Sequence, residues 1–464
     1  YDGLQAVYDY GQWGSELKKN IKDYWWKSMT QFQENIVGID AAIFMHPTTW
    51  KASGHVDNFN DPMIDNKDSK KRYRVDHLIE GYAEELRSKG EKEAKEADDI
   101  LAAMDAWLAQ DNFIELKKLI EHNKMKCPIS GTSNWTDIRQ FNLMFSTEFG
   151  STVSSDDEDN KVYLRPETAQ GIFVNFLNVQ KTGRMKIPFG IAQIGKAFRN
   201  EIVARQFIFR MREFEQMEMQ FFIRPGTQKE WYEQWKQERL KWHLSLGTPA
   251  DKYRFHDHIK LAHYADSACD IEYEFPIGFK EVEGIHSRTD FDLKQHQEYS
   301  KKKMQYFDND IDESTGKPYG NYIPYVIETS IGLDRMFLLV MSNAYNEEDL
   351  STPEKQDSRV VLKFPPMLSP IKLAILPLTK KDGLPEIAQS IFDNCKSSFR
   401  CFFEEKDSIG KRYRRMDALG TPFCVTVDHQ TKEDNTVTIR HRDSMEQERV
   451  SIDKLKEIVI KAIG

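Results

Sequence analysis

The chain has 464 residues, which exceeds what one hydrophobic core usually serves, so we expect two or three domains. Its formal net charge of -9 excludes a surface that is basic throughout, so any contact with RNA must come from local basic patches. Five cysteines without a CxxC pair argue against a disulfide framework and indicate a reducing, cytoplasmic setting. No apolar run approaches the length of a membrane span, so we expect no membrane partner.

The first third of the chain predicts a helix, a strand and a helical insertion. Residues 15–30 have helical spacing with Ser15 as N-cap, and residues 35–49 read as an apolar strand closed by Pro47. Residues 78–126 are rich in Ala, Leu, Glu and Lys at helical spacing. This segment suits a helical insertion on a catalytic core, either as a peripheral scaffold or as a contact for an RNA end.

The next stretch predicts a strand followed by a helix. Residues 135–149 indicate strands and turns, and residues 154–160 form an acidic loop tip to which we assign no function. Residues 162–176 begin as an apolar strand and continue as a helix, with Glu167 at the junction. Side chains at such junctions commonly point into a cleft, although a glutamate there can also compensate a helix N-terminus.

Residues 198–222 concentrate charge among aromatic and aliphatic side chains, with four arginines and four glutamates. They predict two paired strands joined by a loop at 203–208. From Phe214 onward apolar and polar residues alternate, which places Gln216 and Glu218 on the face of Phe214 and Glu215 on the opposite face. Guanidinium groups beside aromatic rings suit a nucleoside triphosphate, because they bind phosphate and stack on flat rings. The alternative is an exposed amphipathic hairpin with surface ion pairs.

Two later strand segments carry unusual charges. Residues 270–292 predict two strands, the second with Glu281 and Glu283 one residue apart, so we expect both carboxylates on one face, as Mg²⁺ bridging phosphates would require. Residues 322–341 predict an apolar strand that turns into an apolar helix. A buried hairpin does not explain Arg335 at the start of that helix, because an unpaired buried charge is costly.

The C-terminal part has a different character. A proline-rich linker at 353–370 precedes alternating strand and helix patterns at 371–464, which predict a small α/β domain. Its densest basic patch, Lys411 to Arg415, includes Tyr413 and suits phosphate contact with base stacking. The alternative is a solvated helix face. Residues 228–246, by contrast, predict an amphipathic helix whose tryptophans pack against the core.

Three separated stretches together resemble the class II aminoacyl-tRNA synthetases, and specifically the homodimeric glycyl-tRNA synthetase family. The order Phe198-Arg199-Asn200-Glu201, a loop, Arg210, Phe214 and Glu218 resembles motif 2. Residues 15–49 are similar to motif 1, and residues 322–341 to motif 3, with Asp334 where many class II enzymes have Glu. Agreement in order over nearly the whole chain is more specific than any one motif.

This resemblance implies the fold. It implies an α+β catalytic domain at 1–352 with an antiparallel sheet of the class II type and a helical insertion at 78–126. A linker at 353–370 and an α/β anticodon-binding domain at 371–464 would follow.

The resemblance also implies the activity. Glycine would be activated with ATP and Mg²⁺ to glycyl-adenylate and transferred to the 3′ end of tRNA(Gly), forming AMP and diphosphate, by a cytoplasmic homodimer. Two alternatives stay open: a class II synthetase for another amino acid, and a non-catalytic tRNA-binding relative.

The resemblance assigns site residues one by one. Arg199 would hold the α-phosphate and Arg335 the γ-phosphate, as the catalytic residues, and Glu281 would meet Mg²⁺ through ATP. The ATP-binding set is Arg199, Asn200, Glu201, Phe209, Arg210, Met211, Arg212, Glu213, Phe214, Glu281, Val282, Gly332, Leu333, Asp334 and Arg335. The glycine-binding set is Arg74, Glu167, Phe214, Glu215, Gln216, Met217, Glu218, Arg288, Glu328, Thr329, Ser330, Ile331 and Gly332. The tRNA-binding set is Lys411, Arg412, Arg414 and Arg415.

Zinc is the point at which the chain departs from the resemblance. Many members of the family carry a CxxC pair before the position of Arg74 and a second near the segment CPISG, and together these hold zinc. Here Asn66 and Ser69 replace the first pair, and only Cys127 is left of the second, with Ser130 as its counterpart. One cysteine cannot build the site, so we predict no structural zinc.

Overall fold

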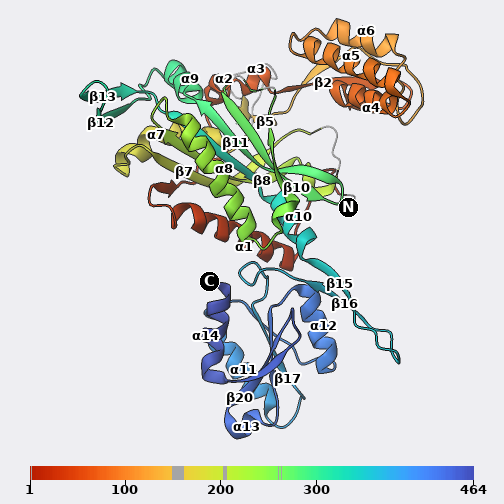
Figure 1. Ribbon diagram of the computed structural model, residues 1–464, viewed down its shortest axis with the longest axis vertical. Coiled ribbons are helices and arrows are strands. Elements are labelled where there is room, and N and C mark those ends of the chain that lie inside the picture. Colours follow the sequence, from red (N-terminus) through yellow and green to blue (C-terminus); the bar gives the residue numbers. More distant parts are fainter. Residues whose placement is uncertain (2, 149–160, 202–205, 260, 263) are drawn as a thin grey trace. The chain divides into compact units, whose positions relative to one another are not determined.

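The computed structural model describes residues 1, 3–148, 161–201, 206–259, 261–262 and 264–464 (Figure 1). Within these residues, backbone contacts divide the chain into two compact units. The first comprises residues 1–7, 42–170 and 197–213, and the second comprises residues 8–41, 171–196 and 214–464. The acidic run predicted at 154–160 lies outside the described residues.

The first unit contains the helical insertion predicted from the sequence. Its helices α4, α5 and α6 enclose a core with Ile79, Ile100 and Leu116 at its centre, next to a sheet in the order β3-β2-β4. Its helices and strands are α2 (Pro47–Ala52), α3 (His55–Asn58), β2 (Asn60–Asn66), β3 (Lys71–Arg74), α4 (Val75–Arg87), α5 (Glu91–Leu108), α6 (Phe113–His122), β4 (Arg139–Asn142), β5 (Ser146–Glu148) and β6 (Lys161–Tyr163). The strands and turns predicted at 135–149 are confirmed for the described residues.

Two predictions near the N-terminus are wrong in detail. The predicted strand at 35–49 is only Ile36–Gly38 (β1), and helix α2 begins at Pro47. Proline suits the first helical turn because its missing N–H would have no partner there, and the His46 ring accepts from the backbone N–H of Thr48. Helix α1 (Gln12–Thr30) begins before Ser15, whose hydroxyl instead donates to the Gln12 carbonyl.

The second unit is built on a sheet with the order β1-β7-β8-β14-β11-β10-β9 in the described residues. β14 pairs antiparallel with both β8 and β11, β11 pairs antiparallel with β10, and β1 pairs parallel with β7. Its elements include β7 (Phe189–Phe198), β8 (Glu213–Ile223), β9 (Tyr253–Asp257), β10 (Ser267–Phe275), β11 (Gly278–Thr289), α9 (Phe291–Ser300), β12 (Tyr306–Asp312), β13 (Lys317–Tyr322), β14 (Tyr325–Gly332), α10 (Leu333–Ala344), β15 (Tyr345–Asp349) and β16 (Ser358–Leu362).

Helices cover both faces of this sheet. Helix α8 (Gln228–Ser245) packs across β11 and β14 (Figure 1), and its Trp231 and Trp235 rings lie 5.0 and 5.2 Å from the Phe221 ring of β8. Helix α7 (Ala169–Thr182) packs on the other side, where its Phe176 ring lies 4.6 Å from that of Phe222. Neighbouring residues of a strand point to opposite faces, so each helix meets alternate residues of β8. The tryptophan helix predicted at 228–246 thus packs against the core.

The C-terminal residues form the predicted α/β domain, with sheet order β18-β17-β19-β20-β21 and a core under α11 and α14. β17 pairs parallel with β18 and β19, and β20 pairs antiparallel with β19 and β21. Its elements are β17 (Leu373–Pro377), α11 (Leu384–Cys395), β18 (Cys401–Phe403), α12 (Ile409–Leu419), β19 (Phe423–Val427), α13 (Thr431–Asp434), β20 (Thr436–His441), β21 (Gln447–Ser451) and α14 (Ile452–Ile463).

Candidate active site

In the second unit, one face of the sheet gathers polar side chains from three adjacent strands. Register places Glu218 opposite Ser330, and Gln220 opposite Glu328, which in turn pairs with His286. Residues that pair across strands point to the same side, so these side chains share a face. We call this surface the polar face; it comprises Gln216, Glu218, Gln220, His286, Glu328 and Ser330, together with Arg288, which lies at a bulge of β11 and bonds Glu328.

Glu328 is the centre of the polar face. Its side chain is buried, and its Oε2 accepts from Gln220 Nε2 at 2.6 Å and from Arg288 Nη1 at 2.8 Å, while its Oε1 lies 2.8 Å from His286 Nδ1. Burial alone would raise the pKa of Glu328, but the charge of Arg288 and the bonds from His286 and Gln220 outweigh burial and hold this pKa far below its ordinary value. The carboxylate is therefore ionised and fixed in orientation.

Arg288 is held on three sides. Its Nε and Nη2 donate to the Asp292 carboxylate at 2.8 and 3.0 Å, and its guanidinium lies 4.0 Å from the centre of the Tyr264 ring. A bidentate pair of this kind fixes the plane of the guanidinium as well as its place. The remaining nitrogen, Nη1, therefore points at Glu328 without freedom to turn.

Gln216 and Glu218 of β8 complete the polar face beside Ser330. Gln216 Nε2 lies 3.4 Å from Ser330 Oγ, and Glu218 Oε1 accepts from Gln220 at 3.2 Å. The expectation that Gln216 and Glu218 share a face is confirmed by these contacts. Several other residues predicted to bind ATP or glycine are buried, as Glu218 and Glu328 are: Met217, Val282, Thr329, Ile331 and Leu333.

Glu215 and Asp334, both assigned to substrate by the resemblance, bond to the N-terminal helix instead. Lys18 Nζ lies 2.9 Å from Glu215 Oε2 and 2.8 Å from Asp334 Oδ1, and Lys22 Nζ lies 2.8 Å from Glu215 Oε1. Asp334 also accepts from the Tyr10 hydroxyl at 2.6 Å and from the backbone N–H of Glu215. These carboxylates tie α1, β8 and α10 together, so their side chains are not part of the polar face.

β11 carries a bulge at Val282 that changes one prediction. Ile271 of β10 pairs with Glu283, whereas its neighbour Glu272 pairs with Glu281. Neighbours on a strand point to opposite faces, so their partners Glu281 and Glu283 do too. The expectation that these two carboxylates share a face is wrong, because the bulge inserts one residue into the alternation.

Glu281 and Arg335 form a partly exposed ion pair. Arg335 Nη1 lies 2.9 Å from Glu281 Oε2 and donates to the Glu281 backbone carbonyl at 3.2 Å. The two side chains are 46% and 25% exposed, which leaves both accessible to a ligand. Gly332 precedes α10 as its N-cap and connects this pair to β14.

In the first unit, the motif 2 residues that precede the loop are organised by backbone bonds. The N–H of Arg199 donates to the Arg212 carbonyl at 2.9 Å, and Arg212 Nε donates to the Glu201 carbonyl at 3.0 Å. Arg199 Nε donates to the Pro166 carbonyl, and its guanidinium lies 5.5 Å from the Phe59 ring centre. The N–H of Asn200 donates to a carbonyl of the same unit.

The described end of the loop is strained. Gln206 and Phe207 have φ values of 65° and 55°, in the left-handed region that costs energy for residues other than glycine. The next residues predicted to bind ATP follow this end of the loop in the sequence. Met211 is buried, and Phe209, Arg210, Glu213 and Phe214 are half-buried. Residues 202–205, including Arg205, lie outside the described residues.

Glu167 and Arg74 lie in this first unit too. Glu167 Oε1 accepts from Gln170 at 3.0 Å, and its Oε2 lies 3.4 Å from His55 Nε2, at the strand-to-helix junction expected from the sequence. Arg74 donates two bonds to Asp76, at 3.0 and 2.5 Å, and its Nη1 lies 3.2 Å from Asp61. The Arg74 guanidinium is therefore half-buried and pairs with two carboxylates.

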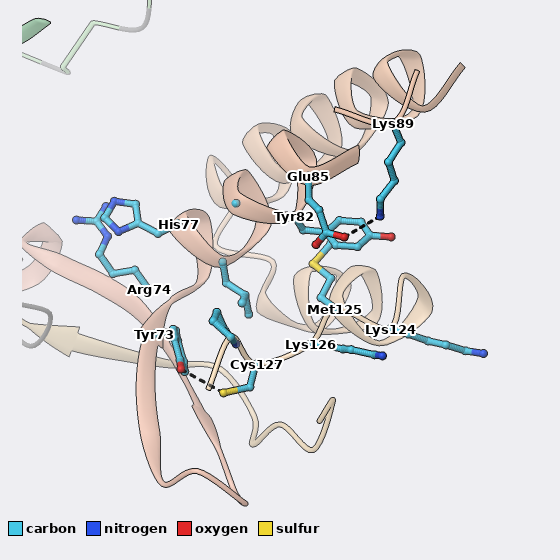
Figure 2. A pocket seen from close by; sticks show the side chains of 13 residues that line it. Tyr73, Arg74, His77, Tyr82, Glu85, Lys89, Lys124, Met125, Lys126 and Cys127 are labelled. Carbon is cyan, nitrogen blue, oxygen red and sulfur yellow. Dashed lines mark hydrogen bonds and ion pairs between the residues drawn. The ribbon is translucent and has the colours of Figure 1, made fainter. Parts of the chain in front are cut away.

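The residues that stand where the resemblance would place zinc ligands form a hydrogen-bonded cluster. Asn66 Oδ1 accepts from Ser69 N at 2.9 Å and from Ser130 Oγ at 3.0 Å, and Cys127 Sγ lies 3.3 Å from Ser69 Oγ. Tyr73 bonds Cys127 at 3.2 Å, beside a cavity of about 560 Å³ that Arg74 also lines (Figure 2). The described residues contain no group of three or more His, Cys, Asp or Glu that could hold a metal ion.

The C-terminal basic patch divides into inner and outer residues. Arg412 is buried in α12 and donates to the Pro377 and Glu404 carbonyls at 2.7 and 2.9 Å, so its assignment to tRNA is wrong. The helical period places it with Met416 against the sheet. Tyr413 bonds Thr426 within the domain, so it is not an open stacking surface. Lys411 is exposed. Arg414 and Arg415 are partly exposed, and each of them pairs with an aspartate.

Sequence reasoning missed Gln220, His286 and Asp292. Gln220 follows Glu218 by two residues in the same alternation, and this spacing was a usable signal. Asp292 follows Arg288 by four residues, but Arg288 lies at a bulge of β11 and Asp292 in the first turn of α9, so no single period joins them. The role of His286 depends on strand register, which the sequence does not display.

Comparison with known proteins gives the family. The family model "Anticodon binding domain" matches residues 372–462, and "Glycyl-tRNA synthetase insertion domain 1" matches residues 61–99 and 92–143. A glycine–tRNA ligase of Chlorobaculum tepidum is 53% identical over 99% of this chain and 95% of its own length. The chain belongs to the glycine–tRNA ligase family. Members from Treponema denticola and Staphylococcus saprophyticus are each 51% identical, over 97% and 100% of this chain and 90% and 94% of their own lengths.

Membership in the glycine–tRNA ligase family confirms the class II resemblance and the C-terminal anticodon-binding domain. The family model of the insertion matches from residue 61 to residue 143, beyond the predicted 78–126, and Ile64 of β2 and Tyr73 of β3 belong to the same core as its helices. None of the described helices has the length and apolar character needed to cross a membrane.

Proposed function

We propose that this chain is a glycine–tRNA ligase that forms glycyl-adenylate from glycine and ATP and transfers glycine to tRNA(Gly). One observation carries the choice of amino acid: Glu218 and the ionised Glu328 lie on one face of adjacent strands beside Ser330. Two carboxylates suit the ammonium of an amino acid. Glycine offers no side chain to grip, so selectivity must come from walls that exclude a β-methyl group.

The first step needs position and charge rather than a side-chain base. A glycine carboxylate oxygen attacks the α-phosphorus, and the bond to the β-phosphate oxygen breaks to release diphosphate. Arg199 holds the α-phosphate and Arg335 the γ-phosphate, with Glu201 and Phe214 against the adenine. A terminal ribose hydroxyl of tRNA then attacks the glycyl carbonyl and releases AMP.

Mg²⁺ fits the residues around Glu281. This carboxylate is 46% exposed, and Asp270 lies close enough that, after burial, Glu281 is the main charge raising the pKa of Asp270. Mg²⁺ usually takes one or two carboxylates together with substrate phosphates, so a second carboxylate close to Glu281 suits it. When bound it would neutralise phosphate charge, while Glu281 and Arg335 orient the β- and γ-phosphates.

Further parts of the proposal concern partners. We assign tRNA contact to Lys411, Arg414 and Arg415 of α12, and glycine contact also to Glu167.

We expect a cytoplasmic homodimer, with α1 and β1 near its interface, because they match motif 1. Light scattering of the purified protein tests this, and the mass of a single chain would contradict it.

The test of the amino acid site is Glu328→Gln. The change keeps the shape but removes the charge, so we expect glycine-dependent ATP–pyrophosphate exchange to fall by about a hundredfold, on the order of the 2–5 kcal/mol for one partner of a buried charge pair. Glu233→Gln, at an exposed position of α8, is the matched control. Near-normal exchange by a folded Glu328→Gln enzyme would refute the site.

The alternatives are tested with the wild-type enzyme. Pyrophosphate exchange supported by a different amino acid alone would establish a synthetase of other specificity. ATP binding without any exchange would favour a non-catalytic tRNA-binding relative. Charging of tRNA with glycine alone is the expected result.

A further inference from the structure

A buried ion network lies beneath the bulge of β11, on the face opposite Glu281. Glu283 accepts from Arg239 Nε at 2.6 Å and lies 2.7 Å from His243 Nε2, both on helix α8. The side chains of Glu283 and His243 are 0% exposed, and that of Arg239 is 3% exposed. No substrate can reach these three groups directly.

The network is aimed at a single carboxylate. In the described part of the chain, Arg239 Nη2 and His243 Nδ1 have no hydrogen-bond partner, whereas Arg239 Nε and His243 Nε2 both bond Glu283. The Arg239 guanidinium also lies 4.6 Å from the Trp242 ring, whose plane stacks with Tyr24 of α1. The position of Glu283 is therefore set by α8 and by the helix packed beside it.

The bulge connects this anchor to the ligand face. Glu283 is the first residue after Val282, and Glu281 is the last before it, so the three residues share one short backbone segment. A bulge bends its strand and re-aims the adjacent side chain. The orientation of Glu281 therefore depends on Glu283. The charged hydrogen bonds from Arg239 and His243 hold Glu283 on the α8 side, and so they hold the backbone of the bulge that points Glu281 to the other face.

Glu281 in turn bonds the motif 3 arginine twice. Arg335 Nη1 contacts both the carboxylate and the backbone carbonyl of Glu281. A shift of the Glu281 backbone would therefore move the arginine's partner as well as a metal-facing carboxylate. Partners that orient metal ligands in this way typically matter nearly as much as the ligands themselves.

We infer that Glu283, held by Arg239 and His243, is a positioning residue that sets the bulge of β11 and so aims Glu281 and Arg335 at the ATP phosphates and their Mg²⁺. This inference rests on the proposed roles of Glu281 and Arg335. It predicts that the network controls the use of ATP and Mg²⁺ but not the capture of glycine, because Glu218 and Glu328, the carboxylates proposed for the ammonium, lie on β8 and β14.

The test separates positioning from folding with two variants. Glu283→Gln removes the anchor, and we expect the Mg²⁺ concentration for half-maximal pyrophosphate exchange and the KM for ATP to rise about 10-fold or more, with KM for glycine within about twofold. The double change Glu283→Leu with Arg239→Leu removes both charges together, and buried pairs replaced in this way often keep full stability.

The double variant distinguishes a positioning role of Glu283 from a role in stability alone. We expect its melting temperature to approach that of the wild type while the ATP and Mg²⁺ defects persist. Normal ATP and Mg²⁺ dependence in the stable double variant would overturn the inference, as would an equal rise in the KM values for ATP and glycine. Should the double variant not fold, the KM split in Glu283→Gln decides alone.

Failure of the proposed roles is distinguishable. Glu281→Gln should reproduce the Mg²⁺ and ATP defect with an intact network. If Glu281→Gln has no effect while Glu283→Gln does, the role of Glu281 is wrong. If the wild-type enzyme shows no glycine-dependent exchange, the proposed function fails before the positioning of Glu281 is tested.

Discussion

Cys127 is a single buried cysteine whose sulfur is surrounded by hydrogen-bond donors. Its thiol is buried, and burial alone would raise its pKa, but bonds from the Ser130 side chain and backbone, Ser69 and Tyr73 outweigh burial and lower the pKa to about 6. The donors that surround the sulfur favour the thiolate, as a metal would. The cluster thereby joins the turn after β2 to residues 127–132.

Stability of the wild type should depend on this thiolate. A pKa of about 6 in the folded state against 9.0 in the unfolded chain means that the stabilisation is complete above pH 9 and lost as pH falls toward 6. We expect the difference in unfolding free energy between wild type and Cys127→Ser to grow with pH, by at most about 1.4 kcal/mol per unit. Urea titrations between pH 6 and 9 measure it, and a pH-independent difference would contradict the lowered pKa.

Zinc content is the second measurement on this cluster. We expect metal analysis of the purified protein to find no stoichiometric zinc, because Asn66, Ser69 and Ser130 offer hydrogen bonds where thiolates would be needed. One zinc per chain would contradict the prediction. A chelator should leave the melting temperature unchanged for the same reason.

At the scale of elements, helix α1 is fastened to the sheet by charge. Its Lys18 lies between Glu215 of β8 and Asp334 of α10, with its side chain 11% exposed. Burial would raise the pKa of Glu215, but the bonds from Lys22 and Lys18 outweigh burial and lower it. The carboxylates of Glu215 and Asp334 thus share the buried ammonium of Lys18, and this ion cluster fixes the position of helix α1 on the sheet.

Lys18→Met should expose the cost of losing that cation. We expect the unfolding free energy to fall by about 3 kcal/mol, since removing one partner of a buried pair leaves the other charges uncompensated. Lys19→Met is the matched control on the same helix, because the Lys19 side chain is 61% exposed and pairs with the equally exposed Asp23; its effect should stay within about 0.5 kcal/mol. Equal losses in urea unfolding would show that the burial of Lys18 is energetically irrelevant.

At the scale of the whole molecule, separate parts of the chain serve separate substrates in the proposed activity. The polar face belongs to the large sheet, whereas Lys411 belongs to α12 of the C-terminal domain, which has its own sheet and core. Activation of glycine and recognition of tRNA should therefore respond to different substitutions.

Lys411→Glu tests this division. We expect weaker tRNA binding and a log–log salt slope that is smaller by about one, the signature of one lost phosphate contact, with unchanged glycine-dependent pyrophosphate exchange. Lys432→Glu, at an exposed position of α13, makes the same change of charge and is the matched control. Indistinguishable tRNA affinities for the two variants would remove Lys411 from the RNA contact.

The sequence by itself determined the family, the strand-to-helix order around Glu167 and motif 3, and the alternation of Gln216 and Glu218, because these depend on local spacing. Only the tertiary structure decided which charges are buried. Glu283 does not share a face with Glu281, because the bulge between them depends on the partner strand. Arg412 is buried, because the sheet beside α12 supplies carbonyl acceptors for its guanidinium. Asp334 bonded to α1 because a residue more than three hundred positions away supplies its cation. Register and long-range pairing have no period in the sequence, and these determined the polar face.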